Sequence, residues 1–79
     1  MSVSIFVTAH DRPGVLARVT GQFVRRGYNI VSLTSRQKPE EPGMAQMTIV
    51  VGIDERAGGQ FVRQLNKLID VIKVEYFPN

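Results

Sequence analysis

Hydrophobic and polar residues alternate in four separate stretches of this chain. A period of two residues is typical of a β-strand that buries one of its faces. In the first stretch, for example, Val3, Ile5 and Val7 share one side. The pattern therefore predicts strands at Ser2–Ala9, Tyr28–Gln37, Met44–Val51 and Val71–Phe77.

The alternation also assigns individual residues to a side of the predicted sheet. In the second strand the alternation places Val31 and Leu33 on one side and Ile30 on the other. In the last strand it places Ile72, Val74 and Tyr76 inward. The side opposite to the core then carries four apolar residues, Phe6, Ile30, Val50 and Phe77. Because contiguous exposed apolar side chains often mark partner surfaces, we expect a protein to bind there.

A first helix is predicted between the turn at His10–Gly14 and Gly27, a residue type that commonly ends helices. Asp11 is the expected N-cap, and Pro13 suits the first helical positions. The apolar stripe of this helix comprises Val15, Leu16, Val19, Phe23 and Val24.

A second helix is predicted to begin at Asp54 or shortly after it, with Phe61, Leu65 and Leu68 as its apolar face. Each glycine inside a helix costs about 1 kcal/mol relative to alanine. The alternative start of this helix therefore lies after Gly58–Gly59. A polar connection with two prolines separates the middle strands. The order βαββαβ predicts an α+β, ferredoxin-like fold with both helices on one face of a four-stranded antiparallel sheet of order 4-1-3-2.

The length of 79 residues predicts a single domain over 1–79. The apolar fraction of 43% is ordinary for a globular protein. Without cysteine and with only His10, the sequence offers neither disulfides nor a thiolate or histidine metal cluster, so we expect no cofactor in this chain. A domain of this size buries only roughly 60% of its unfolded surface. Self-association is therefore the expected additional source of stability.

The net charge of +3 is spread over scattered basic residues, so it predicts a solvated surface rather than a nucleic-acid interface. We read Arg12, Arg18, Arg25 and Arg26 in this way. No apolar run approaches the roughly 20 residues that a membrane helix needs, and no secretion signal precedes the first strand. We therefore expect a cytoplasmic protein without membrane or nucleic-acid partners.

The segment from Asp11 to Ile30 combines free N–H groups at a helix start with an amide side chain, Asn29, at a strand entry. These groups suit a small zwitterion such as an amino acid. Gly14 serves either the geometry of the turn or the approach of a ligand carboxylate, and Asn29 either the tight strand entry or ligand binding.

Two other functions use the same fold but lack the residues that they need. An acylphosphatase-like enzyme would hold a phosphoryl group with Arg12, yet the turn is poor in glycine, and no base or nucleophile accompanies this arginine. An RNA-binding sheet would need aromatic residues on its third strand, which reads Met-Thr-Ile-Val-Val.

The turn Asp-Arg-Pro-Gly-Val-Leu, within the βαββαβ order, resembles the ACT domain, a small amino-acid-sensing module. The resemblance narrows to the regulatory (small) subunit of acetolactate synthase over Gly21–Thr34, Met47–Val51 and Gln64–Val74. It implies a homodimer that pairs the second strands of two copies, and a non-catalytic subunit that activates the catalytic chain and mediates inhibition by valine or a related branched-chain amino acid. It also implies that thiamine diphosphate, magnesium and flavin belong to the partner chain.

The residues that the resemblance implies for the amino-acid site are Asp11, Pro13, Gly14, Val15, Asn29 and Ile30. The common form of this family carries a second domain, so this chain is either a short form or part of a longer subunit. The turn from His10 to Gly14 is closer to ACT modules in general, which leaves a stand-alone sensor attached to another enzyme as the alternative.

Overall fold

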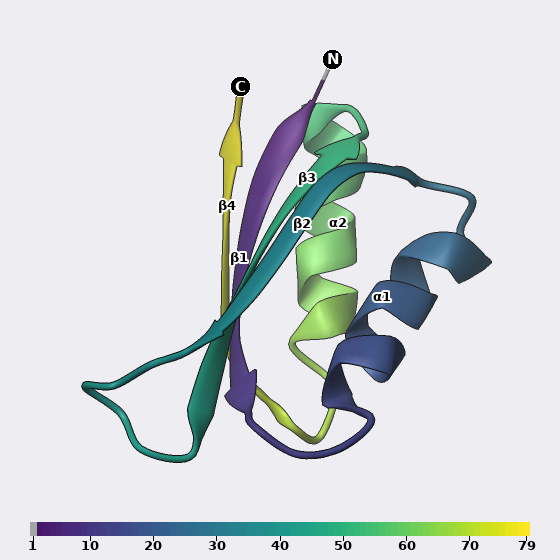
Figure 1. The fold of residues 1–79 in the computed structure, drawn as a ribbon. Helices are drawn as coiled ribbons and strands as arrows, with labels where there is room; N and C mark the ends of the chain where they lie inside the picture. The colour runs from purple at the N-terminus through teal and green to yellow at the C-terminus, as the bar shows by residue number, and fades with distance from the viewer. Residues whose placement is uncertain (1) are drawn as a thin grey trace.

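The computed structural model describes residues 2–79 and contains the six predicted elements in the predicted order (Figure 1). They are β1 (Val3–His10), α1 (Val15–Arg25), β2 (Asn29–Gln37), β3 (Met44–Gly52), α2 (Glu55–Leu65) and β4 (Val71–Pro78). The strands form one antiparallel sheet of order β2-β3-β1-β4, which is 4-1-3-2 read from the other edge. Both helices lie on the same face, which confirms the predicted α+β, ferredoxin-like arrangement (Figure 1).

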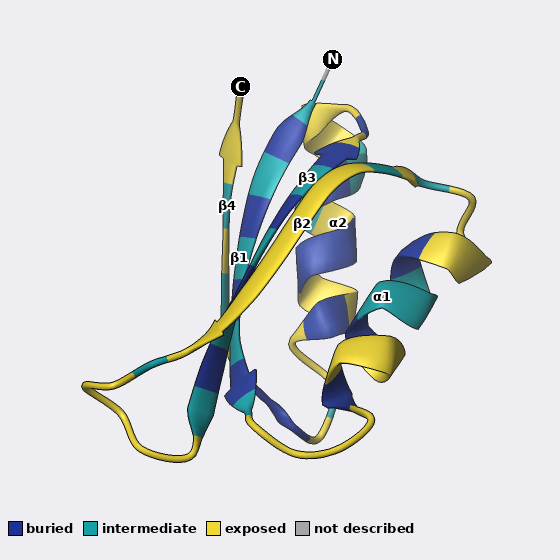
Figure 2. Cartoon of the chain, viewed as in Figure 1, coloured by how far each residue is buried: buried dark blue, intermediate teal, exposed yellow. Residues whose placement is uncertain are grey.

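The core lies between the helices and the two central strands, β1 and β3 (Figure 2). Every second residue of β1 from Val3 to Ala9 is buried, as the alternation predicts. Phe23 from α1 and Phe61 from α2 meet edge to face, with ring centroids 4.6 Å apart. By contrast, β2 is exposed along most of its length, so one edge of the sheet is only partly covered (Figure 2).

A bulge in β2 corrects the predicted orientation of its first residues. Ile30 pairs with Val51 and Ser32 pairs with Val50, which leaves Val31 as an extra residue with 63% of its surface exposed. An extra residue reverses the alternation from that point. The assignment of Ile30 to the uncovered face was therefore wrong, because Ile30 packs against the core.

A second bulge lies in β4, where the register with β1 shifts between Thr8 and Ala9. Val71 is buried there, and Ile72 is half exposed. The prediction that Ile72 points inward was wrong, whereas Val74 and Tyr76 pack against the core as predicted. Phe6 and Phe77 remain together on the face away from the helices, with ring centroids 5.5 Å apart.

The start of α1 differs from the prediction. The N-cap is Gly14, in a left-handed conformation at φ 85°, and it forms no side-chain capping bond. Asp11 is not the cap; its carboxylate accepts a hydrogen bond from Gln37 instead. Pro13 precedes the cap rather than occupying the first helical turn, and His10 is the last residue of β1 rather than a turn residue.

The end of α1 follows the prediction, because Gly27 leaves the helix at φ 72°. The N–H of Tyr28 binds the carbonyl of Phe23, and the N–H of Gly27 binds that of Val24, which is the Schellman arrangement. The predicted apolar stripe is narrower than expected. Leu16 and Val24 are exposed rather than buried.

The second helix begins before its glycine pair. Asp54 caps it by accepting a hydrogen bond of 2.8 Å from the N–H of Ala57. The later start beyond Gly58–Gly59 was therefore wrong. Leu68 lies past the end of α2 but still packs against the core.

Candidate functional site

The turn between β1 and α1 brings four of the predicted site residues together: Asp11, Pro13, Gly14 and Val15. Gly14 caps the helix without a side-chain bond. The N–H of Val15 binds the carbonyl of Arg12 at 3.2 Å, so the candidate donors of the first turn are the N–H groups of the residues that follow Val15. The side chain of Val15 is buried in the core. The polar groups of this turn are therefore the backbone donors, the carboxylate of Asp11 and the guanidinium of Arg12.

The two other predicted site residues, Asn29 and Ile30, lie at the opposite end of α1, where β2 begins (Figure 1). The 11 residues of α1 separate the two groups, which corresponds to roughly 16 Å at the usual rise per residue. A single copy of the chain therefore does not bring Gly14 and Asn29 together.

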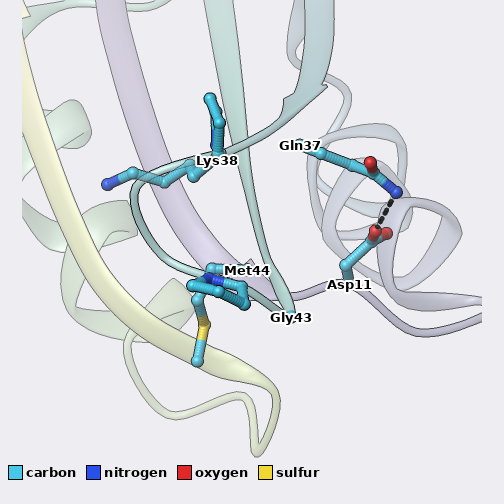
Figure 3. A pocket seen from close by; sticks show the side chains of 7 residues that line it. Asp11, Gln37, Lys38, Gly43 and Met44 are labelled. Carbon is cyan, nitrogen blue, oxygen red and sulfur yellow. Dashed lines mark hydrogen bonds between the residues drawn. The ribbon is translucent and has the colours of Figure 1, made fainter.

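The far end of β2, however, returns to the Gly14 turn. The side-chain amide of Gln37 donates a hydrogen bond of 2.9 Å to the carboxylate of Asp11 (Figure 3). The N–H of Asp11 binds the carbonyl of Gly43 at 2.9 Å, so the β2–β3 connection is attached to the same turn. These segments line an open hollow of about 610 Å³, formed by Asp11, Gln37, Lys38, Pro39, Pro42, Gly43 and Met44.

One long-range partner of the turn was missed by sequence reasoning. Asp70, before β4, is buried with 6% of its surface exposed. Its carboxylate accepts hydrogen bonds from Arg18 at 2.5 Å and from Arg12 at 3.4 Å. Its carbonyl accepts from the N–H of His10 at 2.9 Å. We call the side-chain cluster of Arg12, Arg18 and Asp70 the Asp70 clamp.

These contacts change the interpretation of the basic residues in and next to α1. Arg12 and Arg18 are half exposed but are paired with a carboxylate rather than merely solvated. Arg26 lies with its guanidinium 5.7 Å from the centre of the Phe61 ring. The pairs span 52 and 58 positions of the sequence, so no local pattern could have indicated them.

Together these groups are suited to binding a small charged molecule, with backbone donors, two guanidiniums and a carboxylate around one turn. Within residues 2–79 no three His, Cys, Asp or Glu side chains are grouped as metal ligands. None of the helices in this part of the chain is long and apolar enough to cross a membrane.

Residues 5–73 match the family described as the AHAS small subunit-like ACT domain. The probable acetolactate synthase small subunit of Methanothermobacter thermautotrophicus is 56% identical over 70 residues, which cover 89% of this chain and 41% of that protein. The corresponding protein of Archaeoglobus fulgidus is 50% identical over 74 residues, or 94% of this chain and 46% of that protein. This chain thus spans less than half the length of these curated relatives.

Solved structures agree with this similarity. The small subunit of acetolactate synthase from Thermotoga maritima superposes with a TM-score of 0.87 and 34% sequence identity, over 96% of this chain and 47% of that one. The ACT domain from GTP pyrophosphokinase of Chlorobium tepidum superposes with a TM-score of 0.82, over 100% of this chain and 88% of that one. At 19% identity, this second likeness shows the fold alone.

Proposed function

This chain belongs to the ACT-domain family of acetolactate synthase small subunits, and on that premise we propose that it is a non-catalytic regulatory subunit. It binds and activates the catalytic chain of acetolactate synthase in the cytoplasm, and it conveys inhibition by valine or another branched-chain amino acid. The observation that carries the proposal is that the candidate site is divided between the two ends of α1, while the free β2 edge can reunite the halves in a dimer.

The amino-acid site is proposed at the Gly14 turn. Unsatisfied N–H groups at a helix start attract a carboxylate, and a glycine lets it approach the backbone closely. Asn29 offers both a donor and an acceptor to a zwitterion. Asp11 and Pro13 shape the turn. The side chains of Val15 and Ile30 pack in or against the core, so these two residues would support the proposed site rather than present apolar walls to the ligand.

The homodimer is proposed to form through β2 and α1. Arg18 and Arg26 extend toward the α2 side of α1, where they meet Asp70 and Phe61. Leu16 and Val24 lie on the rest of the helix surface, away from Arg18, and both are exposed. A second copy would cover these apolar side chains.

Antiparallel pairing of two β2 strands accounts for the divided site. The strand runs from Asn29 to Gln37, so pairing about its centre sets Asn29 of one copy opposite Gln37 of the other. Gln37 contacts Asp11 in the turn that leads to Gly14. Each dimer would then contain two complete sites, each with the turn of one copy and the strand entry of the other.

A reconstitution experiment tests this function. The purified chain alone should turn over no pyruvate, should raise the activity of an acetolactate synthase catalytic subunit, and should lose that effect when valine is added. Asn29→Ala should keep the activation and weaken the valine response, because the side chain is exposed at the strand entry. Failure to bind the catalytic subunit would contradict the proposed partner.

The alternative is an amino-acid-sensing ACT module that regulates another enzyme. The turn from His10 to Gly14 favours this alternative, because it is closer to ACT modules in general. It predicts that calorimetry detects amino-acid binding by the chain while the acetolactate synthase catalytic subunit is not activated. Activation in the reconstitution experiment would exclude this alternative.

A further inference from the structure

The Asp70 clamp holds two guanidiniums beside the Gly14 turn. A buried carboxylate is costly unless it is paired, and each oxygen of Asp70 accepts from one arginine, Arg12 of the turn or Arg18 of α1. The clamp alone carries one positive charge, which the carboxylate of Asp11 in the same turn offsets. Any preference for an anion therefore depends on where the guanidinium donors lie rather than on net charge.

One guanidinium nitrogen of Arg18 lies close to Gly14. Its Nη2 donates to the carboxylate of Asp70. Its Nη1 lies 3.6 Å from the position that a Cβ atom on Gly14 would occupy. The planar guanidinium holds its donors in a fixed fork, so binding Asp70 with one nitrogen fixes the direction of the other.

We propose that Arg18 is a specificity-determining residue that recognises the carboxylate of the effector, and that Asp70 is the positioning residue that orients it. This inference rests on the proposed amino-acid site at Gly14. The effector class is then an amino acid with a free carboxylate, since the corresponding amide offers no charge to the guanidinium. Arg12, more exposed and at a longer distance from Asp70, has the secondary role of balancing the buried carboxylate.

Calorimetric titration of the chain with L-valine and with L-valinamide tests the proposal. The unmodified chain should bind valine more tightly than valinamide. Arg18→Gln should weaken valine binding roughly ten- to hundredfold, the usual range for a lost charge-assisted hydrogen bond, and should leave valinamide binding unchanged or tighter. Arg25→Gln, in the last turn of the same helix, is the matched control and should change neither affinity.

Variants of Asp70 separate positioning from charge. Asp70→Asn keeps the size of the side chain and should reduce the preference for valine over valinamide, although Arg18 is unchanged. Arg18→Lys keeps the charge without the fork and should weaken valine binding less than Arg18→Gln does. Circular dichroism shows whether each variant is folded. If Arg18→Gln is not folded, the affinities of Arg18→Lys for valine and valinamide test the proposal.

The outcomes distinguish the inference from the function on which it rests. If the unmodified chain binds no branched-chain amino acid, the proposed effector site fails and the inference fails with it. If the unmodified chain binds valine but Arg18→Gln weakens both ligands equally, or neither, then only the role of Arg18 is overturned.

Discussion

Gly14 combines a structural and a proposed functional demand at one residue. Its φ of 85° lies in the left-handed region, which costs a residue with a side chain roughly 1–2 kcal/mol. The same position ends the turn that carries Asp11 and starts the helix that carries Arg18. A substitution at Gly14 therefore acts on the fold and on the site together.

A pair of alanine substitutions in one helix measures the cost of this conformation. We expect Gly14→Ala to lower the free energy of unfolding by about 1 kcal/mol or more, because alanine is strained at positive φ. Gly21→Ala, inside α1 with open space around its Cβ position, should raise it by about 0.5–1 kcal/mol. Urea denaturation at a fixed chain concentration measures both, and equal shifts of the same sign would contradict the assigned cap.

At the scale of elements, α1 has two differently used sides. One side holds the Asp70 clamp and the Arg26–Phe61 contact, and the other exposes Leu16 and Val24. Sequence reasoning assigned these two residues to the core because a wide apolar stripe normally faces the core. In a single copy both side chains stay exposed, and the proposed dimer would cover them.

The exposed side of α1 can be tested without disturbing the core. Val24 is 73% exposed, so Val24→Asp should leave each copy folded but place two like charges near each other in the proposed dimer. We expect the dimer to dissociate at least tenfold more readily in analytical ultracentrifugation. Ile72→Asp, at an exposed apolar residue of the other edge strand, is the control and should leave the dimer intact. A dimer that is weakened by Ile72→Asp alone would move the interface to β4.

Regular elements were predictable from the sequence because their hydrophobic periods are local. The errors have local causes too: the bulges at Val31 and Ile72 add one residue without changing the composition of their strands, so Ile30 and Ile72 were assigned to the wrong side. The Asp70 clamp depends on distant positions that meet only in the folded chain. The family resemblance indicated the proposed site residues, and the predicted helix between Gly14 and Gly27 already placed them in two groups; the return of Gln37 to the Asp11 turn became visible only with the structure.

At the scale of the whole molecule, size limits stability. The radius of gyration of 11.7 Å is close to the roughly 12 Å expected for a folded chain of this length. Within residues 2–79, fourteen buried residues form the core cluster, and a core this small supplies only about 3–5 kcal/mol. Covering Leu16, Val24 and Leu33 in a dimer would therefore add a substantial fraction of the total stability.

This dependence predicts a thermal midpoint that rises with chain concentration. Because unfolding of a dimer releases two chains, each tenfold increase in concentration stabilises the folded dimer by about 1.4 kcal/mol near room temperature. Calorimetric scans over a hundredfold concentration range should show a progressive increase in Tm. A Tm that stays constant over that range would show that each copy is stable on its own.

The bulge at Ile72 has a consequence for what happens beyond the dimer. A sheet joined through β2 ends in β4 on both sides, and an open terminal strand would recruit further copies in an unending ribbon. The register shift at Ile72, the charged pair of Lys73 and Glu75 at 3.6 Å and the missing donor of Pro78 all make β4 a poor template for such growth. In the proposed dimer the two edges of this small sheet would therefore differ: β2 would pair with one neighbour, and β4 would end the sheet.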